Sequence, residues 1–486
     1  MTGEMSDQNA VVVGAGPNGL VAAITLARAG WRVTVLESAA TPGGGMRSAE
    51  LTLPGVLHDI CSAIHPLALG SPVFRELAAS DRTLADHGLE WVHSDVALAH
   101  PLDDGRAALL HRSLDVTASG LGADGSAYRR LFGPHVEAGF DLTDGLLSPF
   151  ALPPKHPMAL ARYGAVGIRS ARGVARSRFD EDEAQALFGG LAGHSILSLR
   201  SPATAGYGLM LGVLAHVVGW PLARGGSQRI ADALVALLAS YGGTVECDHR
   251  VTSLAELPPA AAVLLDVTPR QFLAIAGDSV PSRYRKRLTH FRHGAGVFKI
   301  DWALDGPIPW TNPECSRAAT VHVGGKLDEI VLAEGEVQNG RHPERPYVLL
   351  AQQSLFDGDR APAGTETVWA YCHVPNGSTV EMTDCIESQI ERFAPGFRDR
   401  IIARHTMNTE AMHDHNANYI GGDINGGIAD LRQFVARPTL GLHPWKTPLK
   451  GVYLCSSSTP PGGGVHGMCG WHAAQEALRD SKRDRR

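Results

Sequence analysis

Three glycines near the start of the chain are spaced so that a backbone can approach a phosphate group closely. They are Gly14, Gly16 and Gly19. In this pattern the first glycine permits a tight turn, the second leaves room for a pyrophosphate, and the third lets a helix pack closely on a strand. Glu37 follows at a distance that suits a carboxylate accepting hydrogen bonds from ribose hydroxyls. These residues predict a dinucleotide site whose phosphates face the N–H groups of a helix N-terminus.

The elements that must position these residues surround them in the expected order. Residues 10–13 form a short apolar run, which is typical of a buried parallel strand. Residues 20–29 are rich in alanine and predict a helix that stops at Gly30, and residues 32–36 predict a second strand that ends at Glu37. This order favours a nucleotide site over a bare glycine turn. Because the carboxylate repels a 2′-phosphate, the site suits FAD or NAD rather than NADP.

A glycine run follows the acidic residue and favours FAD over NAD. It consists of Gly43, Gly44 and Gly45. A chain without side chains at these positions can pass close to a second part of a long cofactor. The run resembles the glycine doublet of the glutathione-reductase-like FAD proteins, in many of which an arginine follows directly. Here Arg47 is displaced by two residues, so we assign it no cofactor contact.

Two later segments look like returning parts of the same nucleotide domain. Residues 225–251 combine glycine pairs with a helix and a strand, although an ordinary αβ unit would give the same pattern. Residues 451–455 predict a strand, a loop of small residues follows over 456–468, and a helix begins at Cys469. A helix N-terminus at this loop would stabilise the negative charge of a reduced flavin.

The sequence therefore predicts an α/β fold with a discontinuous, Rossmann-type FAD-binding domain of the glutathione-reductase-like kind. We expect this domain to comprise residues 1–70, 225–290 and 430–486. Residues 71–224 and 291–429 would then form an inserted α+β substrate-binding domain, more helical in its first part and containing a sheet in its second.

Several motifs together identify a resemblance to a known family. The chain resembles the phytoene desaturase (phytoene dehydrogenase)-like FAD-dependent oxidoreductases, a branch of the amine-oxidase-like flavoproteins. Within them it resembles the branch that contains pyridine nucleotide-disulfide oxidoreductase domain-containing protein 2. The motifs are GAGPNGL (14–20), PGGG (42–45), DICSAIHPLALGSP (59–72), KIDWALDGPIPW (299–310), TVHVGG (320–325), NYIGGDINGG (418–427) and PPGGGVHGMCG (460–470).

The resemblance implies FAD as the cofactor and a hydrophobic small molecule as the substrate, with polyenes as the substrates of the wider family. Dithiol chemistry is rejected despite the branch name, because Cys61 has no partner cysteine nearby in the sequence. Together with the glycine pattern, the resemblance implies cofactor contacts from Gly14, Gly16, Pro17, Asn18, Gly19, Glu37, Gly43, Gly44, Gly45, Val251, Ser457, Gly463, Gly464, Val465, His466, Gly467 and Met468.

Two histidines are the candidates for acid–base work. His65, with Asp59 nearby, could face the flavin ring, but structural hydrogen bonding around the cofactor is the favoured interpretation. His466 could move a proton or attach flavin covalently, and Cys469 could do the latter, although cofactor packing explains both positions equally well. The catalytic acid or base is otherwise not predicted.

Other polar residues have plainer interpretations. Lys299 and Asp301 could form an internal ion pair or lie on a solvated strand face. Residues 413–415 (His-Asp-His) lack a fourth ligand at suitable spacing, so no metal site is expected. Asp423 is expected to bind backbone or cofactor hydroxyls.

Composition narrows the function classes. The 486 residues include 44 Lys and Arg against 50 Asp and Glu, a net charge of −6 that argues against nucleic acid as the main partner. Seven dispersed cysteines are no disulfide framework, and residues 1–8 lack the features of a signal peptide, so a reducing cytoplasm is the expected location. Residues 201–223 are uncharged but rich in glycine, which favours a buried, bent helix or a tunnel wall over a membrane span.

A basic stretch over residues 155–178 could contact a membrane. Its arginines at 162, 169, 172 and 176 have the spacing of one helix face, and no acid interrupts the stretch. Such a face could rest on anionic lipid, or it could simply be solvated. The sequence predicts no oligomeric state.

The favoured function is an FAD-dependent dehydrogenase or desaturase that moves hydride between a C–C bond of a polyene- or lipid-like substrate and flavin. Alternatives are a redox-neutral isomerase, a flavin-bound protein with a structural or partner-binding role, and an amine oxidase, which would need an aromatic cage and a lysine near the flavin. A second dinucleotide motif is absent from the sequence, which disfavours a nicotinamide-dependent reductase.

Overall fold

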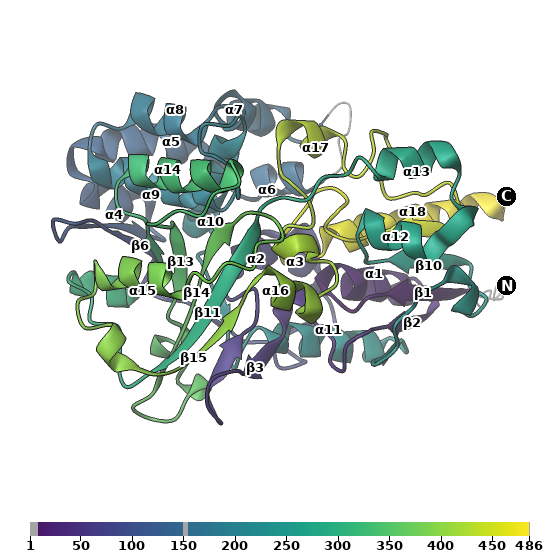
Figure 1. Cartoon of the computed structure of the whole chain (residues 1–486). Coiled ribbons are helices and arrows are strands. Elements are labelled where there is room, and N and C mark those ends of the chain that lie inside the picture. The colour runs from purple at the N-terminus through teal and green to yellow at the C-terminus, as the bar shows by residue number, and fades with distance from the viewer. Residues whose placement is uncertain (1–7, 149–153, 486) are drawn as a thin grey trace.

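The computed structural model describes residues 8–148 and 154–485, and it contains two main sheets with helices packed around them (Figure 1). The first sheet is parallel, with five strands in the order β16-β10-β1-β2-β9. Segments far apart in the sequence therefore meet in one sheet. Its strands are β1 (Asn9–Val13), β2 (Arg32–Leu36), β9 (Thr244–Glu246), β10 (Ala262–Leu265) and β16 (Val452–Leu454).

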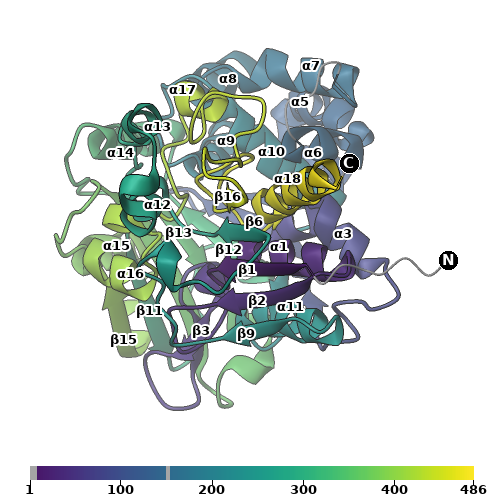
Figure 2. The same ribbon diagram turned by 90° about the vertical axis from the view of Figure 1, so that its right-hand side faces the viewer.

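Both faces of the first sheet are covered, because successive residues of a strand point to opposite sides. Val12 belongs to a core shared with helices α1, α11 and α18, whereas Val11 and Val13 pack in a second core with Phe272 of α12. Figure 2 shows α12 and α13 on one side of this sheet and α18 on the other. The helices are α1 (Pro17–Arg28), α11 (Gln228–Ser240), α12 (Pro269–Ala276), α13 (Ser282–Leu288) and α18 (Met468–Asp484).

The second sheet has seven strands in the order β15-β11-β14-β13-β12-β6-β7. Only the β6–β12 pair is parallel among these described strands, and the others are antiparallel. One face packs on α15 (Thr383–Glu391) through residues such as Ile300 and Leu350. The strands are β6 (Val96–Pro101), β7 (Ala107–His111), β11 (Gly296–Leu304), β12 (Ala318–Val323), β13 (Val348–Ala351), β14 (Glu366–Val374) and β15 (Ile401–Met407).

A helical layer covers the other face of the second sheet. Its central helix is α10 (Thr204–Val217), which is buried along most of its length and packs against α5, α7, α8 and α9. The predicted buried helix is thus present, and burial inside the protein explains its apolar composition. The layer comprises α4 (Leu114–Gly120), α5 (Gly125–Ala138), α6 (Phe140–Leu147), α7 (Pro157–Gly167), α8 (Ala171–Arg178), α9 (Asp182–Gly193) and α14 (Leu327–Gln338).

The basic stretch 155–178 does not form the single helix that its spacing predicts. Helix α7 ends at Gly167, and Ser170 caps a second helix, α8, by accepting a hydrogen bond of 3.2 Å from the Gly173 N–H. Arg172 and Arg176 both form ion pairs with Asp328 of α14. The prediction of one unbroken basic face is therefore wrong, because a capping serine interrupts the helix and an acid from another element meets two of its arginines.

Shorter elements complete the described fold. They are β3 (Ser48–Glu50), β4 (Leu57–Asp59), β5 (Trp91–Val92), β8 (Leu222–Ala223), α2 (Pro66–Gly70), α3 (Pro72–Ala78), α16 (Thr409–His415) and α17 (Leu431–Val435). Within residues 8–148 and 154–485, none of the helices has both the length and the apolar character that crossing a membrane requires. The expected domain bounds at residues 70, 225, 290 and 430 stay a prediction.

Candidate cofactor and substrate site

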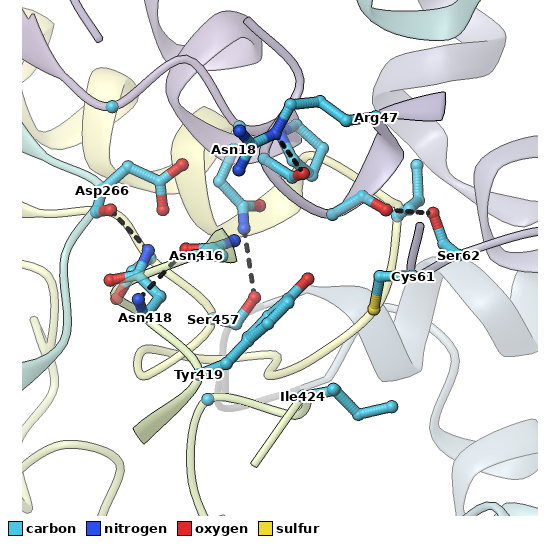
Figure 3. Close-up of a pocket in the computed structure, with 18 of the residues that line it drawn as sticks. Asn18, Arg47, Cys61, Ser62, Asp266, Asn416, Asn418, Tyr419, Ile424 and Ser457 are labelled. Carbon is cyan, nitrogen blue, oxygen red and sulfur yellow. Dashed lines mark hydrogen bonds between the residues drawn. The ribbon is translucent and has the colours of Figure 1, made fainter. Parts of the chain in front are cut away.

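A continuous cavity of about 640 Å³ runs from the glycine turn after β1 to the strands β13 and β14 of the second sheet. Its size lies in the range of small-molecule sites. Figure 3 shows part of its wall, where Asn18, Arg47, Tyr419 and Ser457 come together from distant segments. We call the part near Gly14 and Glu37 the nucleotide end. The far end is lined by Leu211, Trp220, Leu349, Ala351, Trp369 and Tyr371.

The glycine turn at the nucleotide end has no room for side chains. A Cβ atom on Gly19 would lie 2.0 Å from the carbonyl oxygen of Gly14, and one on Gly16 would lie 3.0 Å from an oxygen of Asp266. Gly14 also has a φ of +101°, which favours glycine. Gly14 and Gly16 line the cavity, together with the adjoining Pro17 and Asn18, whereas Gly19 supports the turn from behind.

Asp266 completes this turn from the end of the neighbouring strand β10. Its carboxylate accepts a hydrogen bond of 3.0 Å from the Gly19 N–H, and burial raises its pKa to about 7. The backbone oxygen of Asp266 accepts a hydrogen bond of 2.9 Å from the side-chain N–H of Asn418. The side-chain oxygen of Asn418 accepts a hydrogen bond from the Thr268 N–H. Asp266, Thr268 and Asn418 all line the cavity, and no sequence inference assigned them to the site.

Glu37 lies where a ribose would be recognised. It is buried, and its two oxygens accept hydrogen bonds from the Ala15 N–H (2.7 Å) and the Ala39 N–H (2.9 Å). The Ser38 hydroxyl also donates to Oε1, the oxygen that Ala39 meets, at 3.3 Å. These bonds orient the carboxylate at the cavity wall, and Oε2 keeps a further lone pair for a ribose hydroxyl. Val251 lines the cavity nearby. Its segment is held there because the His249 N–H donates a hydrogen bond to the Glu37 backbone oxygen. A glycine cradle beside a fixed carboxylate fits the pyrophosphate and ribose of FAD.

The glycine run 43–45 brings the chain against the first turn. A Cβ on Gly44 would lie 3.1 Å from the Cα of Gly16, so this close approach requires glycine. Gly44 and Gly45 line the cavity, whereas Gly43 lies behind it and donates a hydrogen bond of 2.8 Å to the Ala15 oxygen. Arg47 lines the cavity too, held by the backbone oxygens of Gly44 and His415. The sequence pattern had no basis for placing it there.

The C-terminal loop forms another wall of the cavity. Ser457, Gly464 and Val465 line it, and the Asn18 amide lies 3.4 Å from the Ser457 hydroxyl. The other loop residues that the motif suggested lie outside the lining. They are Gly463, His466, Gly467 and Met468.

His466 holds this loop rather than facing the cavity. Its Nδ1 accepts a hydrogen bond of 3.0 Å from the Met468 N–H, so its Nε2 donates to the Gly462 oxygen at 3.1 Å. Burial lowers its pKa to about 4, which keeps the ring neutral. The Cys469 sulfur lies 3.4 Å from the same oxygen and 3.4 Å from that of Thr459, and its single S–H can donate to either. Both side chains contact backbone, and neither lines the cavity.

His65 lies at the cavity wall with one bare nitrogen. The Ser227 hydroxyl donates to the Ser62 oxygen, so it accepts from His65 Nε2 at 2.9 Å. The buried Nδ1 therefore carries a lone pair without a partner, and burial lowers the pKa of the ring to about 4. Asp59 does not face the cavity. It is completely buried and binds Arg360 at 2.6 Å, which makes it structural.

The far end of the cavity is apolar and aromatic. Trp369 and Tyr371 project from the same face of β14, and their rings meet edge to face at 5.1 Å. Three carboxylates line the described cavity, from Glu37, Asp266 and Asp414, and none comes from α10, β13 or β14. His194 and Thr320 are polar residues of the lining there, and Nε2 of His194 lies 2.9 Å from Nε2 of the buried His322. The far end thus suits an uncharged, apolar molecule.

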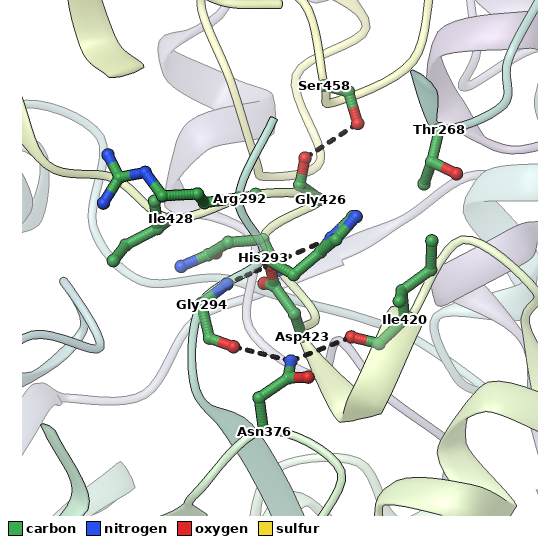
Figure 4. Close-up of polar contacts among 12 residues, drawn as sticks. Thr268, Arg292, His293, Gly294, Asn376, Ile420, Asp423, Gly426, Ile428 and Ser458 are labelled. Carbon is green, nitrogen blue, oxygen red and sulfur yellow. Dashed lines mark hydrogen bonds and ion pairs between the residues drawn. The ribbon is translucent and has the colours of Figure 1, made fainter. Parts of the chain in front are cut away.

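Other polar residues that the sequence singled out lie away from the cavity. Lys299 and Asp301 form an internal ion pair in β11, and both are buried. Asp423 accepts hydrogen bonds from the Gly294 N–H (2.7 Å) and the Asn425 N–H (2.9 Å), and so ties two loops together (Figure 4). Among the residues that the structure describes, no cluster could hold a metal ion, and residues 413–415 form none.

The cavity residues that the sequence analysis missed lie on elements whose sequence pattern did not show which side chains face the cavity. Trp369 and Tyr371 sit at alternate positions of a predicted strand, which indicated only that they share a face. Asn418 and Tyr419 belong to the 418–427 motif, so that motif carried a signal that was not converted into contacts.

Comparisons with known proteins agree with this geometry. Residues 12–80 match a family model described as an NAD(P)-binding Rossmann-like domain. Pyridine nucleotide-disulfide oxidoreductase domain-containing protein 2 of Mus musculus is 26% identical, over 98% of this chain and 94% of that protein. A neurosporene-forming phytoene desaturase of Rhodobacter capsulatus is 24% identical, over 95% of this chain and 92% of that protein. A solved structure of putrescine oxidase has a TM-score of 0.62 at 16% identity, over 98% and 99% of the two chains.

These comparisons confirm the resemblance that the motifs indicated. The α/β fold is Rossmann-like, and the relatives include phytoene desaturases and the disulfide oxidoreductase domain-containing branch. All seven cysteines are free. The chain is an FAD-dependent oxidoreductase enzyme, similar to proteins named as phytoene desaturases and dehydrogenases, and FAD is its cofactor.

Proposed function

For this FAD-dependent oxidoreductase, we propose a dehydrogenase or desaturase activity that moves hydride between a C–C bond of a hydrophobic, polyene- or lipid-like substrate and flavin. The observation that carries the proposal is the cavity itself, which joins a nucleotide end to an apolar, aromatic far end without a break. The relatives named as phytoene desaturases and dehydrogenases support the same reaction class.

The chain divides the work between the two ends of the cavity. Bound FAD supplies the hydride acceptor or donor. Gly14, Gly16, Gly44 and Glu37 would hold its pyrophosphate and ribose. Leu349, Trp369 and the other far-end walls would orient the substrate and exclude water, because an apolar chain gains free energy by leaving water for such walls.

At the far end of the cavity, proton handling falls to neutral groups. The Nδ1 of His65 carries a lone pair without a partner, but the atom is buried and the lowered pKa of the ring makes it a weak base, so it is a poor proton acceptor. No carboxylate lies on α10, β13 or β14 within the cavity lining, so a charged base is not built into those walls. This arrangement favours a reaction in which hydride leaves one carbon for flavin without prior deprotonation by a strong base. The adjacent carbon would then lose a proton to water or to a weakly basic group, which completes the double bond.

An amine oxidase is the second candidate, because Trp369 and Tyr371 present aromatic faces and putrescine oxidase shares the fold. Two observations count against it. A cationic amine would find no carboxylate on the far-end walls, and Lys299 lies in a buried ion pair outside the cavity lining.

The test begins with purified, FAD-loaded protein in air-free buffer. We expect its visible flavin spectrum to bleach with a reduced polyene or a long-chain saturated lipid, and to stay unchanged with NADH, NADPH and apolar amines. Bleaching by NADH or NADPH would instead identify a nicotinamide-linked reductase or a reduced-flavin isomerase. Bleaching by amines alone would identify an amine oxidase. A flavin that no organic reductant bleaches would indicate a structural or partner-binding role.

A further inference from the structure

A second hollow, away from the cofactor cavity, lies between α13 and the segment that contains α17. We call it the α13–α17 groove. Its volume is about 590 Å³, and residues 283–292 and 432–440 line it. Both helices lie on the upper side of the molecule in Figures 1 and 2. The two segments lie far apart in the sequence, so no local sequence pattern predicted the groove.

The groove is strongly basic. Arg283, Lys286 and Arg287 are spaced so that they share one face of α13, and all three are exposed. Arg432 adds another exposed cation from α17. Within the described part of the chain, no carboxylate forms an ion pair with these four cations, unlike Arg292, which pairs with Asp430 at 2.6 Å. A positive surface of this kind stands out on a protein with a net charge of −6.

Large apolar side chains surround the same groove. Leu440 lines it and is 71% exposed, and Leu442 beside it is 84% exposed. Phe434 and Val435 of α17 are 51% and 61% exposed, although neither is among the residues that line the groove. Apolar side chains gathered next to cations are unfavourable in water and mark an interaction surface. The combination of free cations with exposed Leu, Phe and Val is the one that binds the interface of an anionic lipid bilayer.

The two segments are held rigidly together beneath this surface. The Gln433 side chain accepts a hydrogen bond of 3.0 Å from the backbone N–H of Arg292 and donates one of 2.8 Å to the Arg292 backbone oxygen. The Ile428 N–H donates a further hydrogen bond of 3.0 Å to the same oxygen. Arg292 and Ile428 lie close together in Figure 4. The exposed cations of α13 and the exposed Leu440 therefore belong to one preformed groove.

We propose that the α13–α17 groove and its apolar rim dock this protein on a membrane that contains anionic phospholipid. Charge complementarity selects the anionic headgroups, and the exposed apolar side chains enter the boundary with the acyl chains. The inference corrects the place of the expected membrane contact. On α7 and α8, Arg172 and Arg176 are engaged by Asp328, whereas the α13 cations have no such partner among the described residues.

The test is sedimentation of the FAD-loaded protein with vesicles of phosphatidylcholine alone or mixed with phosphatidylglycerol. We expect binding to the anionic vesicles only, weakened by salt. The triple variant R283Q/K286Q/R287Q should weaken it by at least about tenfold, since each cation near an anionic surface contributes to binding. L440S/L442S should weaken it by about tenfold, because less apolar surface is buried.

Two matched variants make the result specific to this groove. K482Q/R483Q/R485Q removes three exposed cations at the end of α18 and should leave vesicle binding unchanged. R162Q/R169Q/R178Q removes three exposed cations of the 155–178 stretch and should also leave it unchanged. An unchanged melting temperature and flavin spectrum establish that each variant is folded.

Three outcomes would overturn the proposal. Equal binding to neutral and anionic vesicles would remove the role of charge. Loss of binding in the 155–178 variant, with none in the α13 variant, would return the contact to α7 and α8. Binding of soluble polyaspartate without any binding of vesicles would assign the groove to an acidic protein partner.

Discussion

The two ends of the cofactor cavity recognise their ligands by opposite means. At the nucleotide end, side chains are absent where the ligand must approach, and backbone geometry with one carboxylate does the work. At the far end, bulky side chains from α10, β13 and β14 form the walls. The difference teaches that cofactor binding rests on a short local segment, whereas substrate selection rests on how distant elements pack.

The sharpest way to break this comparison is at the nucleotide end. Gly19→Ala should prevent flavin binding and lower the free energy of unfolding by roughly 3 kcal/mol or more, because the new Cβ would lie 2.0 Å from the Gly14 oxygen. Flavin absorbance and thermal unfolding measure both effects. Gly164→Ala is the matched control, since nothing lies within 4 Å of a Cβ there. Normal flavin content in the Gly19 variant would contradict the packing argument.

The far end should lose substrate without losing cofactor. Trp369→Ala should weaken binding of the hydrophobic substrate by about thirtyfold, because a large aromatic wall of the cavity is removed. Flavin content should stay at one per chain, and titration of the flavin spectrum with substrate measures the loss. Trp471→Ala, at a partly exposed position of α18, should leave substrate binding unchanged. Loss of flavin in the Trp369 variant would show that the two ends are not separable.

Replacing the carboxylate at the nucleotide end should weaken cofactor binding without changing substrate binding. Glu37→Gln should weaken FAD binding by about tenfold, since charge-assisted hydrogen bonds to a ribose become neutral ones. Quenching of flavin fluorescence measures the affinity. At saturating FAD, substrate binding should match the unsubstituted protein. An unchanged FAD affinity would mean that Glu37 does not meet the ribose.

The remaining prediction concerns pH and the C-terminal loop, and its effect builds up gradually as the pH falls. Burial lowers the pKa of His466 to about 4, so between about pH 6.5 and pH 4 the unfolded chain binds a proton that the folded chain does not. Stability from this group is therefore present at neutral pH and lost as the pH falls, by at most about 1.4 kcal/mol per pH unit. His466→Asn should reduce the acid slope of the unfolding free energy. An unchanged slope would show that His466 is charged in the folded protein.

Much of the nucleotide end was predictable because its information is local. The turn, the helix and the carboxylate lie within residues 10–37, and each is dictated by near neighbours. The sequence did not predict which side chains face the cavity where a distant segment of the chain determines their position. Arg47 reaches the cavity because the backbone of His415 holds it, and Asp59 is withdrawn from it because Arg360 binds it. Neither partner is close in the sequence.

The sequence alone determined the Rossmann-like class, the FAD cofactor and the apolar character of the long uncharged helix, because these depend on spacing and composition. Tertiary structure alone decided which residues face the substrate, since a strand pattern shows that Trp369 and Tyr371 share a face but not what that face meets. It also decided which cations remain free, because Asp328 lies far along the chain from Arg172 and Arg176, and an ion pair depends on distance in space.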